Sequence, residues 1–468
     1  MRSRKILGTM LAVVMAASAL TGCGSKSETQ TVEKEQAKAS DEKTLNYADI
    51  KVGEDFKDIK TTISFYNCRT DMDKEDYPGK NWNYYVTEFN KLYPDIKVDI
   101  QSDTDFANNA LVRLQGGDWG DIMYIPAIDK KELSTYFLSY GDTETMKTQI
   151  KYATAWEYQG QEYGVPCMGN ALGLVYNKAI FKQAGIDKLP TTPEEFMKDL
   201  QLIKDKTDAI PLYTNYAAKW TMGAWDAYIG GTATGDAKFM NQTLLHSATP
   251  FSDPGDGTGP YNVYKILYDA VANGLTEEDY STTDWEGSKG MLNSGKIGCM
   301  ALGSWAYSQM KSAGDHPEDV GYMPFPITVN GKQYTASAGD YSYAINVKSS
   351  SDNQKAAMLF VKWLTENSNW ANNEGAMSVD KKNTTLPETY SEFGNVEFIE
   401  DEPAVSGEED VLNTLNADSE LMVNNGGNDK VLSIVEHASN KDQSFDDIMN
   451  DWNKKWSEAQ KQNDIEQK

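Results

Sequence analysis

Residues 61–125 decide the fold class, and they read TTISFYNCRT DMDKEDYPGK NWNYYVTEFN KLYPDIKVDI QSDTDFANNA LVRLQGGDWG DIMYI. Apolar residues alternate over 62–66 and again over 96–100, which is typical of strands. Helical spacing follows each strand: Trp82, Tyr85, Val86, Phe89, Leu92 and Tyr93 before Pro94, then Phe106, Ala110, Leu111 and Leu114 before Gly116-Gly117. With the apolar run 122–125, this β-α-β-α-β order predicts an α/β fold whose largely parallel sheet is covered by helices.

A second α/β unit begins near residue 172. We predict a strand over 172–176, a helix over 178–184 closed by Gly185, and a longer helix with Thr192, Pro193 and Glu195 at its start. Further strands are expected over 209–213, 297–302 and 343–347, and further helices over 352–366 and from about residue 444. Because no long polar linker separates the units, we expect two lobes in close contact, with a ligand cleft at the carboxyl ends of the strands.

The N-terminal segment has the pattern of a processing signal. Basic residues precede an apolar stretch from Ile6 to Leu20, which is followed by Leu20-Thr21-Gly22-Cys23. About 15 apolar residues are fewer than the ~20 that a membrane-spanning helix needs, so we predict a lipoprotein signal peptide over 1–22. Cys23 would then carry the lipid. Residues 24–46 are polar and contain no aromatic side chain, so they cannot form a packed core. We therefore assign 23–60 to the lipidated cysteine and a flexible tether.

Charge excludes several functional classes. The chain has 44 Lys and Arg against 70 Asp and Glu, a net charge of −26, which opposes binding to nucleic acid and to anionic lipid surfaces.

The three histidines are scattered, so a zinc enzyme is disfavoured. The acidic loop 253–259 lacks EF-hand spacing, and its turn-forming residues explain it. We therefore expect no metal site and no cofactor.

Three cysteines remain after Cys23. Cys68, Cys167 and Cys299 are an odd number, which excludes a framework of disulfides. Three buried thiols are the favoured interpretation, and a Cys68–Cys167 bridge stays open.

Several motifs occur in the order of a known family. They are Tyr163-Gly164-Val165-Pro166, Leu174-Val175-Tyr176-Asn177-Lys178, Ala184-Gly185-Ile186, Leu189-Pro190-Thr191-Thr192-Pro193-Glu194-Glu195-Phe196, and Gly295-Lys296-Ile297-Gly298-Cys299-Met300 with Gly303-Ser304-Trp305. This set closely resembles family 1 extracellular solute-binding proteins of ABC transporters. The turn Gly116-Gly117-Asp118-Trp119-Gly120-Asp121 is similar to that family's turn, although Gly-Asp replaces the usual Pro-Asp.

The resemblance implies a two-lobe Venus-flytrap fold with crossover strands and a helix-covered, mainly parallel sheet in each lobe. We place lobe one at 61–168 and 340–395, and lobe two at 169–339 and 396–468. It also implies a lipid-anchored receptor on the outer face of the cell membrane, which binds a carbohydrate, expected to be an oligosaccharide, and delivers it to an ABC permease with its ATPase. We expect a monomer without enzymatic activity.

A sugar site needs aromatic faces for stacking and polar side chains for paired hydrogen bonds. Trp305 follows a predicted strand and matches the family's stacking tryptophan. Other candidates lie at strand ends, at the crossovers or in nearby loops: Asn67, Arg69, Asp121, Asn170, Trp220, Trp285, Asp340 and Tyr341. Several of these could instead be structural, since Asn67 and Arg69 could cap a turn and Asp121 could make a structural hydrogen bond.

Two alternatives remain open. The same fold could bind a peptide, a polyamine or an anion, although Arg69 alone is thin support for an anion site. A secreted glycosidase with two carboxylates is the alternative from another class. The sequence contains no GxSxG, HExxH or P-loop motif, and the binding-protein signatures weigh against an enzyme.

Overall fold

The computed structural model describes residues 45–468 except 78 and 424–427, and it leaves the side chains of 107 and 108 undescribed. The predicted signal peptide and the lipidation site at Cys23 lie outside the described residues. Residues 45–60 do not belong to a tether, which corrects the predicted boundary at residue 60. Tyr47, Ile50 and Ile59 are buried in the same hydrophobic core as the strands of the first sheet, because packing there removes their apolar side chains from water.

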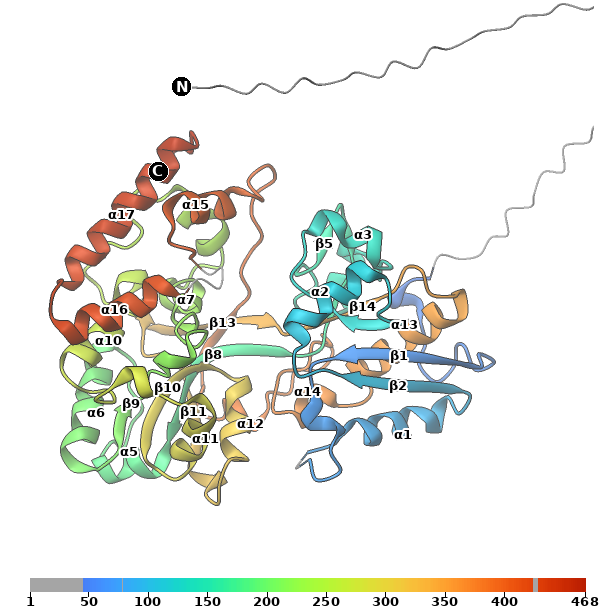
Figure 1. Ribbon diagram of the computed structural model, residues 1–468, viewed down its shortest axis with the longest axis horizontal. Helices are drawn as coiled ribbons and strands as arrows, with labels where there is room; N and C mark the ends of the chain where they lie inside the picture. Colours follow the sequence, from blue (N-terminus) through green and yellow to red (C-terminus); the bar gives the residue numbers. More distant parts are fainter. Residues whose placement is uncertain (1–44, 78, 424–427) are drawn as a thin grey trace, which may run out of the picture. The chain divides into compact units, whose positions relative to one another are not determined.

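The first of two large sheets has the strand order β2-β1-β3-β14-β7. Its strands are β2 (Ile96–Ser102), β1 (Thr61–Asn67), β3 (Ile122–Tyr124), β14 (Ser342–Ile345) and β7 (Val165–Pro166). β1 pairs in parallel with β2 and β3, whereas β14 is antiparallel to β3 and β7. The helices α1 (Trp82–Leu92), α2 (Phe106–Gly116) and α13 (Ser351–Glu366) surround this sheet, and we call the body the first lobe (Figure 1).

The second large sheet has the strand order β12-β13-β8-β10-β9, with β11 on β8 and β15 on β13. Its strands are β12 (Thr328–Val329), β13 (Lys332–Gly339), β8 (Gly169–Asn177), β10 (Ile297–Gly303), β9 (Ile210–Leu212), β11 (Val320–Met323) and β15 (Glu397–Ile399). We call the body around it the second lobe. Its helices include α5 (Lys178–Ala184), α6 (Pro193–Lys206), α10 (Gly259–Ala272), α11 (Trp285–Asn293), α12 (Trp305–Lys311), α15 (Val411–Ser419), α16 (Asp429–Asn440) and α17 (Phe445–Gln462).

Two strands connect the lobes. β8 and β13 run side by side between them in Figure 1, paired antiparallel from Ser337–Ala171 to Gly339–Gly169. This arrangement confirms the predicted fold class and its crossover strands. β9 and β10 are parallel, as expected, whereas β8 is antiparallel to β10, β11 and β13. β8 and β13 are antiparallel because the chain enters the second lobe through β8 and returns through β13.

The predicted helices and strands are present. The largest shift is at β8, which begins at Gly169 rather than at residue 172. Thr192 Oγ1 accepts the Glu195 N–H at 3.3 Å, as the capping box predicts, but Glu195 returns the contact to the N–H of Thr191 at 2.8 Å. Gly117 and Gly185 end α2 and α5 with φ of +76° and +82°, which is a conformation that glycine adopts readily.

Each lobe has its own hydrophobic core. One core joins the first sheet to α1 and α13 and includes Trp363, while another joins the second sheet to α10, α16 and α17 and includes Trp452 and Trp456. A smaller core on β8 and β10 also takes in Tyr390 and Phe393. Tyr390 and Phe393 lie within the range predicted for the first lobe but pack on strands of the second sheet. The lobe boundary at residue 395 stays a prediction.

The shorter helices and strands complete the lobes. They are α3 (Leu133–Tyr136), β4 (Gly141–Asp142), α4 (Thr143–Gln149), β5 (Glu157–Tyr158), β6 (Gln161–Glu162), α7 (Ala224–Ala227), α8 (Gly231–Thr234), α9 (Leu244–His246) and α14 (Trp370–Asn373). Across 45–468, apart from the undescribed positions, no helix has the length and apolar character that crossing a membrane requires.

Candidate functional site

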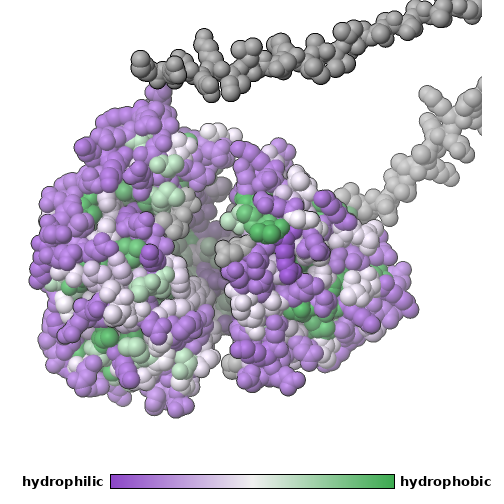
Figure 2. Space-filling view, in the orientation of Figure 1, coloured by the Kyte–Doolittle hydropathy of each residue, from purple (hydrophilic) through white to green (hydrophobic). Residues whose placement is uncertain are grey.

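A cavity of about 670 Å³ is lined by residues of both lobes. The first lobe contributes the segment after β1, the segment after β7, the link between β13 and β14, and the segment after α14. The second lobe contributes α12, beginning with Trp305. Figure 2 shows a hollow in the molecular surface between two largely hydrophilic bodies. The cavity therefore lies where the sequence predicted a cleft, at the ends of β1 and β10.

The first-lobe side of the cavity carries a hydrogen-bonded group of polar and charged side chains, which we call the polar wall: Arg69, Asp71, Tyr77 and Glu374. Arg69 donates to both carboxylate oxygens of Asp71 at 2.9 Å, and its Nη2 also donates to Glu374 Oε2 at 2.8 Å. Tyr77 Oη donates to the same Glu374 oxygen at 2.6 Å. Burial opposes the charge on Arg69, but Asp71 and Glu374 outweigh it and hold the pKa of Arg69 above its ordinary value.

Three tryptophans of the second lobe form an aromatic cluster: Trp220, Trp285 and Trp305. Trp305 opens α12 and lines the cavity, with ring centroids 5.7 Å from Trp220 and 5.8 Å from Trp285. Trp220 lies 5.0 Å from Trp285 and is 45% exposed. A Cβ on Gly303 would lie 2.6 Å from Trp305 Nε1, so the glycine that ends β10 lets the indole fold back over the strand. The sequence predicted all three residues as site candidates; Trp305 lines the cavity, whereas Trp220 and Trp285 pack against it outside the lining.

Asp340 and Tyr341 line the cavity where β13 leads into β14. Tyr341 is 43% exposed and stacks on Tyr124 with ring centroids 5.2 Å apart. Asp340 Oδ2 accepts a hydrogen bond from Asn170 Nδ2 at 2.9 Å, and Asn170 Oδ1 accepts one from Ser304 Oγ at 3.1 Å. Asn170 thus ties the crossover strands to the start of α12 and is not part of the cavity lining.

Asn67 and Asp121 make structural hydrogen bonds outside the cavity. Asn67 is fully buried, and its Oδ1 accepts the backbone N–H of Arg69 at 2.7 Å, which fixes the turn that presents Arg69. Asp121 accepts hydrogen bonds from the Ser64 N–H at 3.0 Å, Ser349 Oγ at 2.6 Å and Asn353 Nδ2 at 3.0 Å. It therefore joins β1 to the start of α13. Neither residue lines the cavity.

The cavity also contains residues that the sequence analysis did not propose. Tyr124 and Cys167 follow the same rule as Arg69, since each lies at or just after the end of a first-sheet strand, and this signal could have found them. Glu374 gave no such signal, because it meets Arg69 only through the fold. Cys68 and Cys167 both line the cavity as free thiols, so the bridge that the sequence left open is not formed. Burial raises the pKa of Cys68 to about 11.

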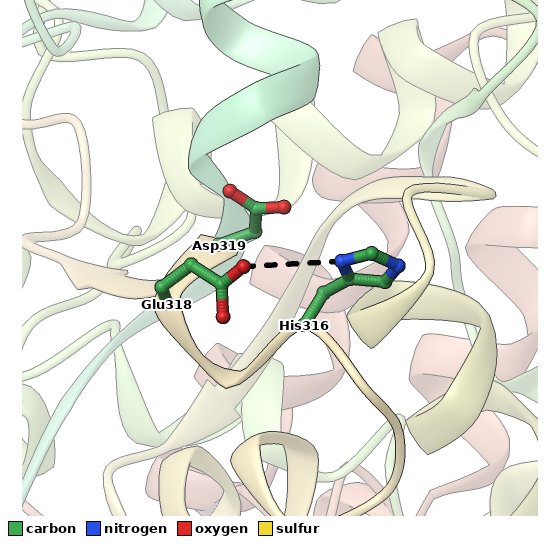
Figure 3. A group of neighbouring side chains, drawn as sticks. All are labelled: His316, Glu318 and Asp319. Carbon is green, nitrogen blue, oxygen red and sulfur yellow. Dashed lines mark ion pairs between the residues drawn. The ribbon is translucent and has the colours of Figure 1, made fainter.

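One surface group has the residue types of a metal site. His316, Glu318 and Asp319 place one ligand atom each within 4.8 Å of one another, and His316 Nδ1 lies 3.9 Å from Glu318 Oε1 (Figure 3). His316 and Glu318 are exposed on the turn before β11. The acidic loop 253–259 uses its carboxylates in turns, since Asp253 accepts the Gly255 N–H and Asp256 the Thr258 N–H. Neither feature contributes to the cavity.

Comparison with known proteins identifies the family. Residues 74–369 match the family model described as "Bacterial extracellular solute-binding protein". The chain belongs to this family. The solute-binding protein is 56% identical to BlMnBP1 of Bifidobacterium animalis subsp. lactis ATCC27673, solved in complex with mannobiose, with a TM-score of 0.83 over 89% of this chain and 99% of that one.

Two further relatives extend the comparison. BlMnBP2 of the same organism, titled a manno-oligosaccharide-specific solute-binding protein and solved with mannotriose, is 55% identical with the same coverage and TM-score. The "Multiple sugar-binding protein" of Streptococcus mutans serotype c (strain ATCC 700610 / UA159) is 27% identical over 66% of this chain and 72% of its own length. All three relatives are described as binding proteins.

Proposed function

We propose that this solute-binding protein is the receptor of a carbohydrate ABC transporter and that it binds manno-oligosaccharides between its lobes. The observation that carries the proposal is the 56% identity, over 89% of this chain, to a protein solved with mannobiose. Relatives at this level of identity share the fold closely, and the two manno-oligosaccharide complexes cover nearly the whole described region. The family assignment restricts the function to solute capture, and these relatives suggest the solute.

The cavity suits a short neutral sugar. Its volume of about 670 Å³ is in the range of small-ligand sites, which span ~300–1,000 Å³. A sugar ring offers apolar C–H faces to aromatic side chains and hydroxyls to polar ones. The aromatic cluster supplies the first kind of contact and the polar wall the second. We propose Trp305, Arg69, Asp340 and Tyr341 as contacts, with Trp220 and Trp285 extending the aromatic surface.

The polar wall disfavours an anionic solute. A free guanidinium would bind a carboxylate or phosphate, but Arg69 already donates to both oxygens of Asp71 and to Glu374. Asp71, Asp76, Asp340 and Glu374 add negative charge to the lining, against Arg69 and Lys74. An anion entering this cavity would meet paired or unfavourable charges.

Ligand binding would work through lobe closure. The crossover strands β8 and β13 provide the hinge, with the lobes at 61–168 plus 340–395 and 169–339 plus 396–468. A solute that contacts both the polar wall and the aromatic cluster favours the closed arrangement, because only there are both sets of contacts made. No covalent step is needed, so we propose a receptor without enzymatic activity.

The cellular setting follows from the family and from the N-terminal sequence. Family members act outside the cytoplasm. We further propose that Cys23 carries a lipid anchor, and that the closed protein docks as a monomer on a permease driven by an ATPase.

Thermal unfolding against a ligand panel tests the proposal. The chain from residue 24 onward, which keeps every described residue, is heated with mannobiose, mannotriose, other sugars, peptides and polyamines. Ligand at ~100 times its dissociation constant adds about 2.7 kcal/mol, which raises Tm by roughly 5–10 °C for domains of this size. A shift with a peptide or polyamine and none with any sugar contradicts the proposed solute. Consumption of the sugar contradicts the assignment as a receptor.

A further inference from the structure

Glu374 uses only one of its two carboxylate oxygens in hydrogen bonds with the described residues. Its Oε2 accepts from both Arg69 Nη2 and Tyr77 Oη, whereas Oε1 is buried and has no hydrogen-bond partner among the described residues. The side chain is only 6% exposed and lines the cavity. A buried polar atom left without a partner costs about 1–3 kcal/mol, and more when the group is charged. Such an atom in a binding cavity therefore points to a partner that arrives with the ligand.

The Glu374 side chain is held through its other oxygen and its backbone. Glu374 directly follows α14, and its backbone N–H bonds to the carbonyl of Trp370 at 3.1 Å. Arg69, which donates a hydrogen bond to Oε2, is itself fixed by two hydrogen bonds to Asp71. Its Cζ lies 5.7 Å from the centroid of the Trp370 ring. The carboxylate is thus preorganised with one oxygen committed and the other spare.

Small residues lie on both sides of the Glu374 carboxylate. Gly375 and Ala376 line the cavity directly after Glu374. On the other side, a Cβ at Gly79 would lie 3.5 Å from Oε1 and 2.8 Å from a ring carbon of Tyr77. A larger residue at position 79 would therefore displace Tyr77 and crowd the carboxylate.

We propose that Glu374 Oε1 accepts a hydrogen bond from one hydroxyl of the bound sugar and is a specificity-determining residue of the site. The inference rests on the proposed function. A carboxylate is an acceptor only, so this contact requires a ligand group that donates. A hydroxyl meets this requirement, whereas an ether oxygen or a fluorine at the same position does not. Glu374 thereby selects for one free hydroxyl of the sugar.

The experiment exchanges donor and acceptor. Calorimetric titration measures the affinity for mannobiose and for analogues in which one hydroxyl at a time is replaced by fluorine. The unchanged chain is expected to lose about 10-fold or more at one position, since hydrogen bonds to charged groups are worth about 1.5–3 kcal/mol. In Glu374→Gln the amide oxygen can keep Arg69 while the NH₂ takes the place of Oε1. Because an NH₂ donates, the penalty at that same position should disappear.

Asp71→Asn is the matched comparison. Asp71 shares Arg69 with Glu374, but both of its oxygens are already bonded to Arg69. Any loss transmitted through Arg69 should occur in both variants, whereas relief of the fluorine penalty should occur only in Glu374→Gln. Glu374→Asp is a second variant, and by shortening the side chain it should reduce the penalty while keeping the charge. Unligated thermal unfolding checks that each variant folds.

The outcomes separate the two proposals. Relief of the penalty at one position in Glu374→Gln and not in Asp71→Asn supports the inference. An identical pattern of penalties in the unchanged chain and in both Glu374 variants overturns the inference and leaves the proposed function standing. If the unchanged chain binds no manno-oligosaccharide, the proposed function fails and the inference fails with it.

Discussion

The two sides of the cavity are built on different physical principles. The polar wall is a hydrogen-bonded network in which Arg69 donates to Asp71, Tyr77 and Glu374 at 2.8–2.9 Å, and Glu374 Oε1 keeps a free acceptor position among the described residues. The aromatic cluster consists of three indoles with centroids 5.0–5.8 Å apart. One side therefore offers fixed donors and acceptors, and the other offers broad apolar faces.

This difference indicates that the two sides contribute differently to stability and to ligand affinity. Charges that are paired before the ligand arrives contribute to folding as well as to recognition, because they stabilise one another in the empty protein. Partly exposed indoles contribute less to folding and more to binding, since their faces lose contact with water only when the ligand covers them. Mutations on the two sides should consequently separate stability from affinity.

Removing Trp305 should have the largest effect on affinity. We expect Trp305→Ala to weaken mannobiose binding by about 100-fold, because buried aromatic anchors contribute roughly 2–4 kcal/mol at binding sites. Calorimetric titration measures the loss, and Trp305→Phe, which keeps an aromatic face, should recover part of it. Equal affinities of the Ala variant and the unchanged chain would contradict the proposed contact between the aromatic cluster and the sugar.

Removing Arg69 should lower the stability of the unligated protein. Arg69→Ala leaves the buried Glu374 carboxylate without its cation, a change that we expect to cost about 2–3 kcal/mol, or roughly 5–10 °C in Tm. Thermal unfolding without ligand measures it, with Arg69→Lys as the variant that keeps the charge. A larger drop in the Tm of the unligated protein in Trp305→Ala than in Arg69→Ala would reverse the comparison of the two sides.

Glu162 provides a buried carboxyl group away from the cavity. It is fully buried on β6, and burial raises its pKa to about 8 from an ordinary value of 4.5. Between these values the folded chain holds a proton that the unfolded chain has lost, so stability falls as pH rises. We expect a fall of about 2 kcal/mol from pH 5.5 to pH 7 from this group.

Glu162→Gln should remove that contribution to the pH dependence. Urea unfolding at the two pH values, for the variant and for the unchanged chain, measures the difference. Mannobiose affinity measured in parallel separates this stability effect from any change in the polar wall. A pH profile of stability that the substitution leaves unaltered would contradict the assignment.

The smallest effect is expected at the edge of the aromatic cluster. Trp220→Ala should weaken mannotriose binding by about 3–10-fold and mannobiose binding by less, because an exposed edge contributes little energy and a longer ligand covers more of it. Calorimetric titration with both sugars measures the ratio. Equal losses for the two sugars would place Trp220 against the part of the ligand that they share.

Local patterns predicted much of the fold. Capping residues such as Thr192 and Ser444 and the glycines after α2 and α5 set helix ends through contacts within a few residues, and these ends were correctly placed. The end of the tether was misplaced because Tyr47 is buried through contacts with Tyr140 and Lys362, which are distant in sequence.

The site was less predictable for the same reason. Arg69 and Trp305 could be proposed because each follows a strand and strand ends meet at one edge of a sheet. Glu374 could not, since its contact with Arg69 joins residues 305 positions apart. Asn67 also ends a strand, but its side chain accepts the backbone N–H of Arg69. Asp121 precedes β3 and lies at the amino end of that strand, where it bonds to β1 and to the start of α13. Position alone does not distinguish these roles.

A crystal structure grown with mannobiose tests the central claim most directly. We predict a sugar ring with its C–H face on Trp305 and its hydroxyls toward the polar wall, including one hydroxyl within hydrogen-bond distance of Glu374 Oε1. Mannobiose bound elsewhere on the protein, or bound in the cavity without contact to either side, would contradict the account.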